Sequence, residues 1–284
     1  GKTMLAQALA SILPAPTLEE IIEVTKIWSA GGALGTQAMI TYRPFRSPHQ
    51  SASPAAIVGG GQNPRPGEIS LAHRGVLFLD ELPEFRRDIL ESLRQPLESG
   101  RTVISRAKSS LTLPARFALV AAMNPCPCGY YGDREKACAC AAHEVMRYQK
   151  KVSGPLLDRI DLQIIVPRVT VSELQDKVPH VTRAMPEMRR AITDARKRQR
   201  DRLSIKHKFT NAEMTSKECE EMILLDEDAR KFIKNAAEKS FLSARGYYRT
   251  LKVAQTIADL EGVSSVSREH LAEAFSYRLR EQFA

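Results

Sequence analysis

The sequence predicts an α/β fold with a parallel sheet in its first part, followed by a small all-α domain. Three short apolar runs, Val76–Leu79, Phe117–Ala122 and Leu162–Val166, alternate with helical or loop stretches, as they do in a parallel sheet with crossover connections. From about Val171 onward, the pattern is helical. Polar residues that follow the apolar runs would lie at the carboxyl edge of the sheet, where α/β folds bind their ligands.

A phosphate-binding motif stands at the start of the sheet domain. Gly1-Lys2-Thr3 runs into an Ala- and Leu-rich segment of high helix propensity and matches the end of the pattern G-x-x-x-x-G-K-[ST]. In that pattern the loop amides hold phosphates, the lysine reaches the β and γ oxygens, and the hydroxyl group ligates Mg²⁺. We therefore expect Gly1, Lys2 and Thr3 to bind nucleotide, and Thr3 also to bind Mg²⁺. Because only the last three residues of the pattern are present, we expect a fragment that lacks the preceding strand and the first glycine.

The stretch from Gly75 to Glu81 is the most informative in the chain. Its apolar part is typical of a central strand covered on both faces, and it ends in the adjacent carboxylates of Asp80 and Glu81. On its own, such a run is often just a strand that enters a polar loop. Paired with the Gly-Lys-Thr motif at a plausible separation, it indicates a site for a nucleotide and its Mg²⁺ ion.

Composition and charge describe an ordinary globular protein. The 284 residues are 43% hydrophobic and 26% charged, and 42 Lys and Arg against 33 Asp and Glu give a net charge of +9. This excess fits a nucleic-acid partner without requiring one. No apolar run approaches the roughly 18 to 20 residues that cross a bilayer, and the N-terminus does not resemble a signal peptide. We therefore expect no membrane association and a cytoplasmic location.

The pattern divides the chain into three parts: an α/β core over residues 1–170, a basic helical linker over 171–210 and a helical lid domain over 211–284. In the linker, eight basic residues against three acidic ones lie between Arg183 and Arg202. For this stretch we favour a solvated helix that joins two domains over a dedicated nucleic-acid contact.

Three helices are predicted after the linker. Asp226 is a candidate N-cap for a helix over 228–239. Apolar positions at helical spacing from Arg245 to Glu261 predict a second helix, which ends before Gly262. Ser267 opens the last helix.

Two further polar side chains are candidates to complete a nucleotide-hydrolysing site. Phosphoryl transfer needs charge neutralisation on the γ-phosphate, a polar group that places the attacking water, and often an arginine from a neighbouring subunit. Asn124, at the end of the second apolar run, can orient water; the alternative is that it only caps a turn before Pro125. Arg159 stands between Asp158 and Asp161, and a local salt bridge is its alternative role.

Taken together, the motifs are specific enough to indicate a family. In chain order they are Gly1–Thr3, Gly75–Phe85, Ala121–Pro125, Leu157–Arg159 and Ser243–Gly246, with three more distinctive stretches at Arg43–His49, Gly59–Gly61 and Pro66–His73. With these residues the sequence resembles AAA+ ATPases of the magnesium-chelatase-like ComM/YifB family over nearly its whole length. One departure is Gln50, where the family often carries a second histidine.

The resemblance implies a fold and a role for each matching residue. The fold is an AAA+ P-loop sheet with flanking helices, followed by a small helical lid. The roles are Walker A for Lys2 and Thr3, the Mg²⁺-side carboxylate for Asp80, the residue that polarises the attacking water for Glu81, sensor 1 for Asn124, the arginine finger for Arg159, and sensor 2 for Arg245. Arg249, one turn further along the same helix, competes for the role of sensor 2. Because the finger acts on ATP held by the next subunit, the resemblance implies an oligomer, in this family a hexameric ring.

Residues 100–114 predict a β-hairpin, because apolar and polar residues alternate on either side of a basic tip. In the family that the chain resembles, an inserted hairpin here points into the pore of the ring. Arg106 and Lys108 are then expected to bind DNA phosphates without reading base sequence. The alternative is an exposed hairpin with incidental charge.

Four of the five cysteines form two close pairs, Cys126-Pro127-Cys128 and Cys138-Ala139-Cys140. Four thiols in two pairs suit tetrahedral coordination of a structural Zn²⁺ ion, and a cytoplasmic protein does not normally use them as disulfides. The alternative is a set of reduced or fortuitously oxidised thiols. Their position after Asn124 favours a structural clip on a loop over catalysis.

The expected cofactors are ATP and Mg²⁺, and the expected function is that of an ATP-dependent DNA motor. From the resemblance, we expect a ring helicase that promotes branch migration in homologous recombination during natural transformation, with single-stranded or branched DNA as partner. One alternative is a magnesium-chelatase motor subunit, in which ATP turnover drives Mg²⁺ insertion into a porphyrin. Another is a scaffold that binds nucleotide without hydrolysis, against which the presence of Glu81 and Arg159 argues.

Overall fold

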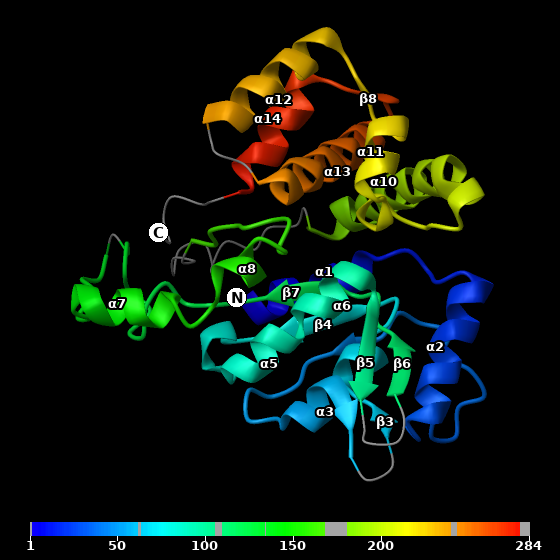
Figure 1. The fold of residues 1–284 in the computed structure, drawn as a ribbon, viewed down its shortest axis with the longest axis vertical. Helices are drawn as coiled ribbons and strands as arrows, with labels where there is room; N and C mark the ends of the chain where they lie inside the picture. Colours follow the sequence, from blue (N-terminus) through cyan, green and yellow to red (C-terminus); the bar gives the residue numbers. More distant parts are fainter. Residues whose placement is uncertain are drawn as a thin grey trace. The chain divides into compact units, whose positions relative to one another are not determined.

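The computed structural model describes residues 2–61, 64–105, 110–133, 135–167, 181–239 and 243–278 (Figure 1). The chain forms two compact units, Gly1–Ile160 and Asp161–Ala284, and each is described by itself. The division falls before residue 170, where the sequence pattern places the end of the α/β core. The basic helix that was predicted as a separate linker belongs to the second unit.

A three-stranded parallel sheet organises the first unit. Its order is β1 (Phe45–Arg46), β4 (Val76–Leu79), β7 (Ala118–Ala121). All four side chains of the middle strand β4 are buried, which explains its unbroken apolar run. Just before β4, the backbone at Gly75 lies very close to the segment that precedes β1, so a Cβ atom there would lie 2.0 Å from the Pro44 carbonyl oxygen. Two of the three predicted strands and their parallel arrangement are confirmed.

The third predicted strand, Leu162–Val166, does not form. Its apolar residues are exposed to solvent, and Ile164 is 68% exposed. An apolar run becomes a strand only where a neighbouring strand can pair its backbone groups. Within the described residues no strand pairs with this segment, and the Gln163 N–H donates to the Tyr277 carbonyl oxygen instead (2.7 Å).

Most of the other regular elements of the first unit are helices (Figure 1). They are α1 (Lys2–Ile12), α2 (Leu18–Ala30), α3 (Pro54–Val58), α4 (Glu68–Leu71), η1 (Leu82–Glu84), α5 (Arg87–Ser92), α6 (Arg94–Ser99), α7 (Ala142–Gln149) and α8 (Gly154–Leu157). Two further sheets have two antiparallel strands each: β2 (Gly59–Gly60) with β3 (Arg65–Pro66), and β5 (Arg101–Ser105) with β6 (Ser110–Pro114). The main apolar core joins β4 to these helices through residues such as Ile57, Leu79 and Leu90.

Two of the stretches that carry the family resemblance hold this unit together. Arg43, ahead of β1, forms an ion pair with Glu20 of α2 (2.8 Å). Arg46 binds both carboxylate oxygens of Glu68 in α4 (2.6 and 2.7 Å). Both arginines make two hydrogen bonds to one carboxylate, a geometry that lysine cannot supply. These residues therefore serve the fold.

The second unit is helical. Its elements are α10 (Val181–Leu203), η2 (Ser204–Lys206), η3 (Asn211–Glu213), α11 (Ser216–Met222), β8 (Leu224–Leu225), α12 (Glu227–Lys239), α13 (Ala244–Glu261), β9 (Ser265–Val266) and α14 (Arg268–Ser276). The three predicted helices are confirmed. Asp226 Oδ1 accepts a hydrogen bond from the Ala229 N–H (2.7 Å) at the start of α12. Gly262 ends α13 in a left-handed conformation, and Ser267 is the N-cap of α14.

One face of α10 packs against α13, so the basic helix is not solvated all round. Arg202 forms an ion pair with the buried carboxylate of Asp259 in α13 (2.6 Å). Arg198 donates to the Asp259 carbonyl oxygen (2.9 Å), and Leu203 is fully buried. These two arginines of the basic stretch therefore contribute to the fold. None of the helices in the described part of the chain combines the length and the apolar character needed to span a membrane.

Candidate active site

Four polar side chains from three distant segments converge at the carboxyl edge of the sheet. The Lys2 ammonium group donates to Asn124 Oδ1 (2.6 Å), and the Thr3 hydroxyl group donates to Asp80 Oδ2 (2.7 Å). The partners are 122 and 77 positions apart in the chain. The structure thus brings together four of the predicted site residues; Gly1 lies outside the described residues.

Strand register explains this convergence. Strands β4 and β7 run parallel with Leu79 opposite Ala121, so the residues that follow the two strands leave the sheet at the same edge. The Ala122 N–H donates to the Leu79 carbonyl oxygen, and the Leu82 N–H donates to the Ala122 carbonyl oxygen (both 2.9 Å). Helix α1 is anchored on the same sheet because Ala6 is buried against apolar residues of β4 and β7.

Glu81 has a left-handed backbone conformation (φ 50°, ψ 48°) directly after Asp80. This conformation costs a non-glycine residue roughly 1–2 kcal/mol, and such strain is found preferentially at functional sites. The Glu81 N–H donates to Asp80 Oδ1 (2.9 Å), and the next residue, Leu82, is buried. The turn leaves the Glu81 side chain exposed to solvent beside the cluster.

The donor set of this cluster fits a magnesium nucleotide. The carboxylate of Asp80 and the hydroxyl group of Thr3 are oxygen ligands of the kind that Mg²⁺ takes together with phosphate oxygens and water. The Lys2 ammonium group is bound to a neutral amide oxygen, so a triphosphate offers it a stronger, charged partner. Lys2 and Thr3 both lie at the N-terminus of α1, where anions are stabilised.

Arg159 follows α8 and is 7% exposed. Its guanidinium group donates to Glu98 Oε2 in α6 (2.6 Å) and to the Pro155 carbonyl oxygen (2.7 Å). The alternative role predicted for Arg159 was a salt bridge with an acid next to it in the sequence, whereas Glu98 comes from a distant helix. Sequence reasoning missed Glu98 because no local pattern links it to Arg159.

The two arginines considered for sensor 2 have different surroundings in the second unit. Arg245 is exposed in the first turn of α13, whose N-cap residue Ser243 accepts a hydrogen bond from the Gly246 N–H (3.1 Å). Arg249 forms an ion pair with Asp161. The role of sensor 2, and the choice between the two arginines, stay predictions.

The predicted hairpin is present as β5 and β6, with Ser105 paired to Ser110 at its described end. The two basic residues predicted to bind DNA, Arg106 and Lys108, lie outside the described residues. Their DNA contact stays a prediction.

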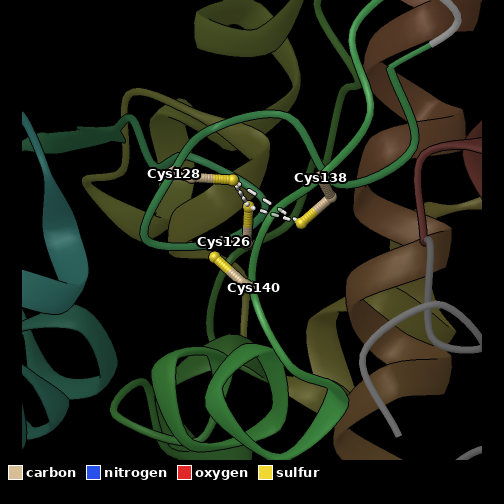
Figure 2. A group of neighbouring side chains, drawn as sticks. All are labelled: Cys126, Cys128, Cys138 and Cys140. Carbon is tan, nitrogen blue, oxygen red and sulfur yellow. Dashed lines mark hydrogen bonds between the residues drawn. The ribbon is translucent and has the colours of Figure 1, made fainter.

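The four paired cysteines lie together between β7 and α7. All four Sγ atoms are within 4.8 Å of one another. Figure 2 shows that the side chains of Cys126, Cys128, Cys138 and Cys140 point toward a common centre. A backbone hydrogen bond at Tyr130 lowers the pKa of the Cys128 thiol to about 6, whereas burial raises the pKa of the Cys138 and Cys140 thiols. It is the geometry of the four sulfur atoms that suits the cluster to metal binding, as the sequence indicates.

A groove with basic walls lies beside the residues that come directly after Asp80 and Glu81 in the chain. Sequence reasoning did not find it. Its volume is about 660 Å³, and η1, α5 and α7 line it. Its Lys and Arg residues are Arg87, Arg147, Lys150 and Lys151. Lys151 pairs with Glu84 at the wall of the groove (3.2 Å). The signal in the sequence is the near-helical spacing of the last three, which places them along one side of α7 and its C-terminus.

The parallel sheet, the Lys-Thr start of α1 and the polar strand ends define the class: an AAA+ P-loop domain followed by a helical unit. The chain belongs to the magnesium chelatase family, in its ComM/YifB group. The family described as magnesium chelatase, subunit ChlI, matches residues 1–174, and its C-terminal domain matches residues 183–278.

Individual relatives agree with this assignment. The chain is 45% identical to Competence protein ComM of Haemophilus influenzae, over 98% of the chain and 53% of the relative. It is 44% identical to YifB of Salmonella typhimurium, over 98% of the chain and 54% of the relative. It is 24% identical to the chloroplastic magnesium-chelatase subunit ChlI of Glycine max, over 79% of the chain and 47% of the relative. The chain thus spans about half the length of the curated relatives it matches.

Proposed function

We propose that this chain hydrolyses ATP and is the motor module of a DNA-translocating AAA+ protein, a ring helicase for branch migration in recombination of incoming DNA. The observation that carries the hydrolytic part is the convergence of Lys2, Thr3, Asp80 and Asn124 beside Glu81. The DNA-directed part is supported by the similarity to a competence protein. The proposed location is the cytoplasm, where DNA and ATP are both present.

Each residue of the cluster has a step that it can perform. Lys2 binds oxygens of the terminal phosphates, and Thr3 and Asp80 hold the Mg²⁺ ion, which neutralises phosphate charge when bound. Glu81 polarises the attacking water as a general base, and Asn124 orients that water. Since Lys2 contacts Asn124 in this structure, nucleotide binding would replace that hydrogen bond by one to phosphate. The amide of Asn124 is then released to bind water.

The proposal includes assembly into a hexameric ring, in which Arg159 acts on the ATP of a neighbouring subunit. An arginine supplied in this way stabilises the charge that develops on the transferred phosphate group. In the single chain, Arg159 is paired with Glu98, so assembly has to exchange that carboxylate for a phosphate. Arg245, on the helical unit, is the proposed sensor 2.

DNA binding is proposed at two places in the first unit. The hairpin tip with Arg106 and Lys108 is one, on the basis of sequence alone. The basic groove beside α7 is the other, because Arg147 and Lys150 are exposed there and carry charge that suits a phosphate backbone. The net charge of +9 agrees with a polyanionic partner.

The test is ATP hydrolysis by the complete protein with and without single-stranded or branched DNA. We expect DNA to raise turnover, and Glu81→Gln to reduce turnover strongly in both conditions while ATP still binds. Normal basal turnover that does not respond to any DNA would reject the helicase function. ATP binding without hydrolysis by the unaltered protein would instead support the scaffold.

The family match favours one second candidate, a magnesium-chelatase motor subunit. That function predicts ATP turnover that ignores DNA and that supports metal insertion only with a partner subunit. The identity of 24% to a chelatase subunit, against 45% to a competence protein, makes it the weaker candidate.

A further inference from the structure

We propose that Cys126, Cys128, Cys138 and Cys140 bind one Zn²⁺ ion, which clips the segment between β7 and α7 and thereby positions Asn124. The metal site stands on sulfur geometry and does not depend on ATP hydrolysis. Only the positioning of Asn124 rests on the proposed function.

The sulfur atoms have the spacing of a single tetrahedral ion. Zn–S bonds of about 2.3 Å in a tetrahedron place the sulfur atoms about 3.8 Å apart. Here the Sγ–Sγ distance is 3.4 Å between Cys126 and Cys128, 3.5 Å between Cys128 and Cys138, and 3.7 Å between Cys126 and Cys138. The Sγ atom of Cys140 lies within 4.8 Å of the other three (Figure 2). A disulfide bond requires about 2.05 Å, and all four thiols are free. The sulfur atoms are also too close together to surround a cluster of several iron atoms.

The backbone around the first cysteine pair supports thiolate ligands. The Tyr131 N–H donates to Cys126 Sγ (3.3 Å), a contact that stabilises negative charge on sulfur. Gly129 and Gly132 have positive φ angles of 83° and 79°, which let the chain turn twice directly after the first pair. The chain can therefore return to bring the second pair onto the first.

The clipped segment has little else to order it. From Asn124 to Ala141, the described residues form neither helix nor strand, and among them only Cys126 is buried. A segment that buries so little apolar surface does not offset the entropy lost on ordering. A metal ion that joins four side chains supplies the missing free energy directly.

Both ends of the clip lead to the proposed active site. Cys126 follows Asn124 after a single residue, and the second cysteine pair immediately precedes α7. Helix α7 then returns to the same place: Gln149 Nε2 donates to the Pro125 carbonyl oxygen (3.0 Å), and the hydroxyl group of the buried Tyr148 interacts with the Asn124 backbone. Loss of the ion would release these contacts, so Asn124 is a residue whose position depends on the metal.

Metal content of the complete protein tests the site. We expect about one zinc ion per chain by elemental mass spectrometry, lost in the double variant Cys128→Ser/Cys140→Ser and retained in the control Cys219→Ala. Cobalt(II) added to the zinc-free protein should give the intense visible absorption of a tetrahedral thiolate site. The proposal is overturned if the unaltered protein binds no zinc when zinc is supplied, if the double variant binds as much, or if intact mass shows that the four thiols are disulfides.

Proteolysis and turnover test what the ion does. Lys136 is exposed within the clip and Lys217 is exposed in α11, so chelation of zinc should speed tryptic cleavage at the first and leave the second unchanged. Turnover of ATP should fall about tenfold on zinc loss, as for other residues that orient a functional group. If Asn124→Ala lowers turnover but zinc loss does not, positioning of Asn124 is rejected. If Asn124→Ala has no effect either, the proposed function fails at this residue, and zinc content alone decides on the clip.

Discussion

The guanidinium group of Arg159 lies 2.6 Å from a carboxylate oxygen of Glu98. The residues are 61 positions apart, and their ion pair links α6 to the turn after α8. The Arg159 side chain is 6% exposed, whereas that of Glu98 is 50% exposed. A buried arginine has given up most of its hydration, so separating it from this carboxylate is costly unless another anion replaces it. A phosphate of ATP in a neighbouring subunit would be such an anion.

Glu98→Gln is therefore expected to raise ATP turnover by the assembled complete protein severalfold, because an amide holds the arginine less strongly than a carboxylate does. Arg159→Ala is expected to lower turnover by roughly a thousandfold. Steady-state ATP hydrolysis, measured where the oligomer is populated, checks both changes. If the two substitutions lower turnover and thermal stability alike, Arg159 serves only the fold.

Mixed oligomers separate action in trans from action within one subunit. Arg159→Ala subunits keep Glu81, and Glu81→Gln subunits keep Arg159, so each supplies what the other lacks. We expect the mixture to recover part of the turnover that either variant alone has lost. An inactive mixture that still assembles would count against a finger acting across the subunit boundary.

Glu81→Gln is expected to reduce ATP hydrolysis by roughly 10²–10⁴-fold while ATP still binds. Glutamine keeps the size of the side chain but cannot take a proton from water, and the left-handed backbone at this position is the same for both residues. Single-turnover hydrolysis and nucleotide binding together check this expectation. Glu19→Gln, the same change at an exposed carboxylate in α2, is the control. Near-normal hydrolysis would remove Glu81 from its proposed role.

The site was predictable wherever a local pattern dictates a position in space. Asp80 and Asn124 each follow an apolar run, and the ends of neighbouring parallel strands meet by geometry alone. Glu98 carries no such signal, because its partner is chosen by the packing of two helices. The sequence therefore predicted the convergence of the polar strand ends but not the contact between Glu98 and Arg159.

Tertiary partners also explain where the structure differs from what composition alone suggests. Leu162–Val166 has the composition of a strand, but no strand in the described part of the chain pairs with it. Helix α10 has the charge of a solvated linker, but the buried carboxylate of Asp259 draws Arg202 and Arg198 into the helical unit. In both cases composition is a local property, and the outcome depended on a residue far along the chain.

Stability is expected to fall on acidification because of a buried histidine. His73 Nδ1 accepts a hydrogen bond from the Arg116 N–H (3.0 Å), so Nε2 carries the proton and lies 3.1 Å from Glu23 Oε2. Burial lowers the pKa of His73 below its ordinary 6.5, and the hydrogen bond from His73, assisted by Arg74, lowers the pKa of Glu23 to about 2.

Both groups bind fewer protons in the folded than in the unfolded chain, so the free energy of unfolding decreases as pH falls. The decrease begins below about pH 6.5 through His73 and continues between about pH 4.5 and pH 2 through Glu23. Urea unfolding of the complete protein at a series of pH values checks this, with His73→Gln expected to remove the upper part of the dependence. Stability that is unchanged between about pH 7.5 and pH 5.5 would contradict the role of His73.

Reversal of charge in the basic groove is expected to weaken DNA binding more than basal ATP hydrolysis. In Arg147→Glu/Lys150→Glu, two phosphate contacts are lost, so the salt dependence of binding to single-stranded DNA should become shallower by about 1.4 in the slope of log K against log[salt]. Lys217→Glu/Lys231→Glu makes the same change in charge at exposed residues of the second unit and is the control. Binding curves at several salt concentrations measure the slope.

The comparison with the hairpin decides which surface holds the DNA. If the groove lies on the path of the strand, its double variant and Lys108→Glu should each flatten the slope, and the combination should flatten it further, because separate phosphate contacts contribute independently. If only Lys108→Glu changes the slope, the hairpin binds DNA without the groove. If the groove variant and its control lose DNA affinity equally, only net charge matters, because a general electrostatic field acts on both pairs of residues alike. The groove would then have no specific part in DNA binding.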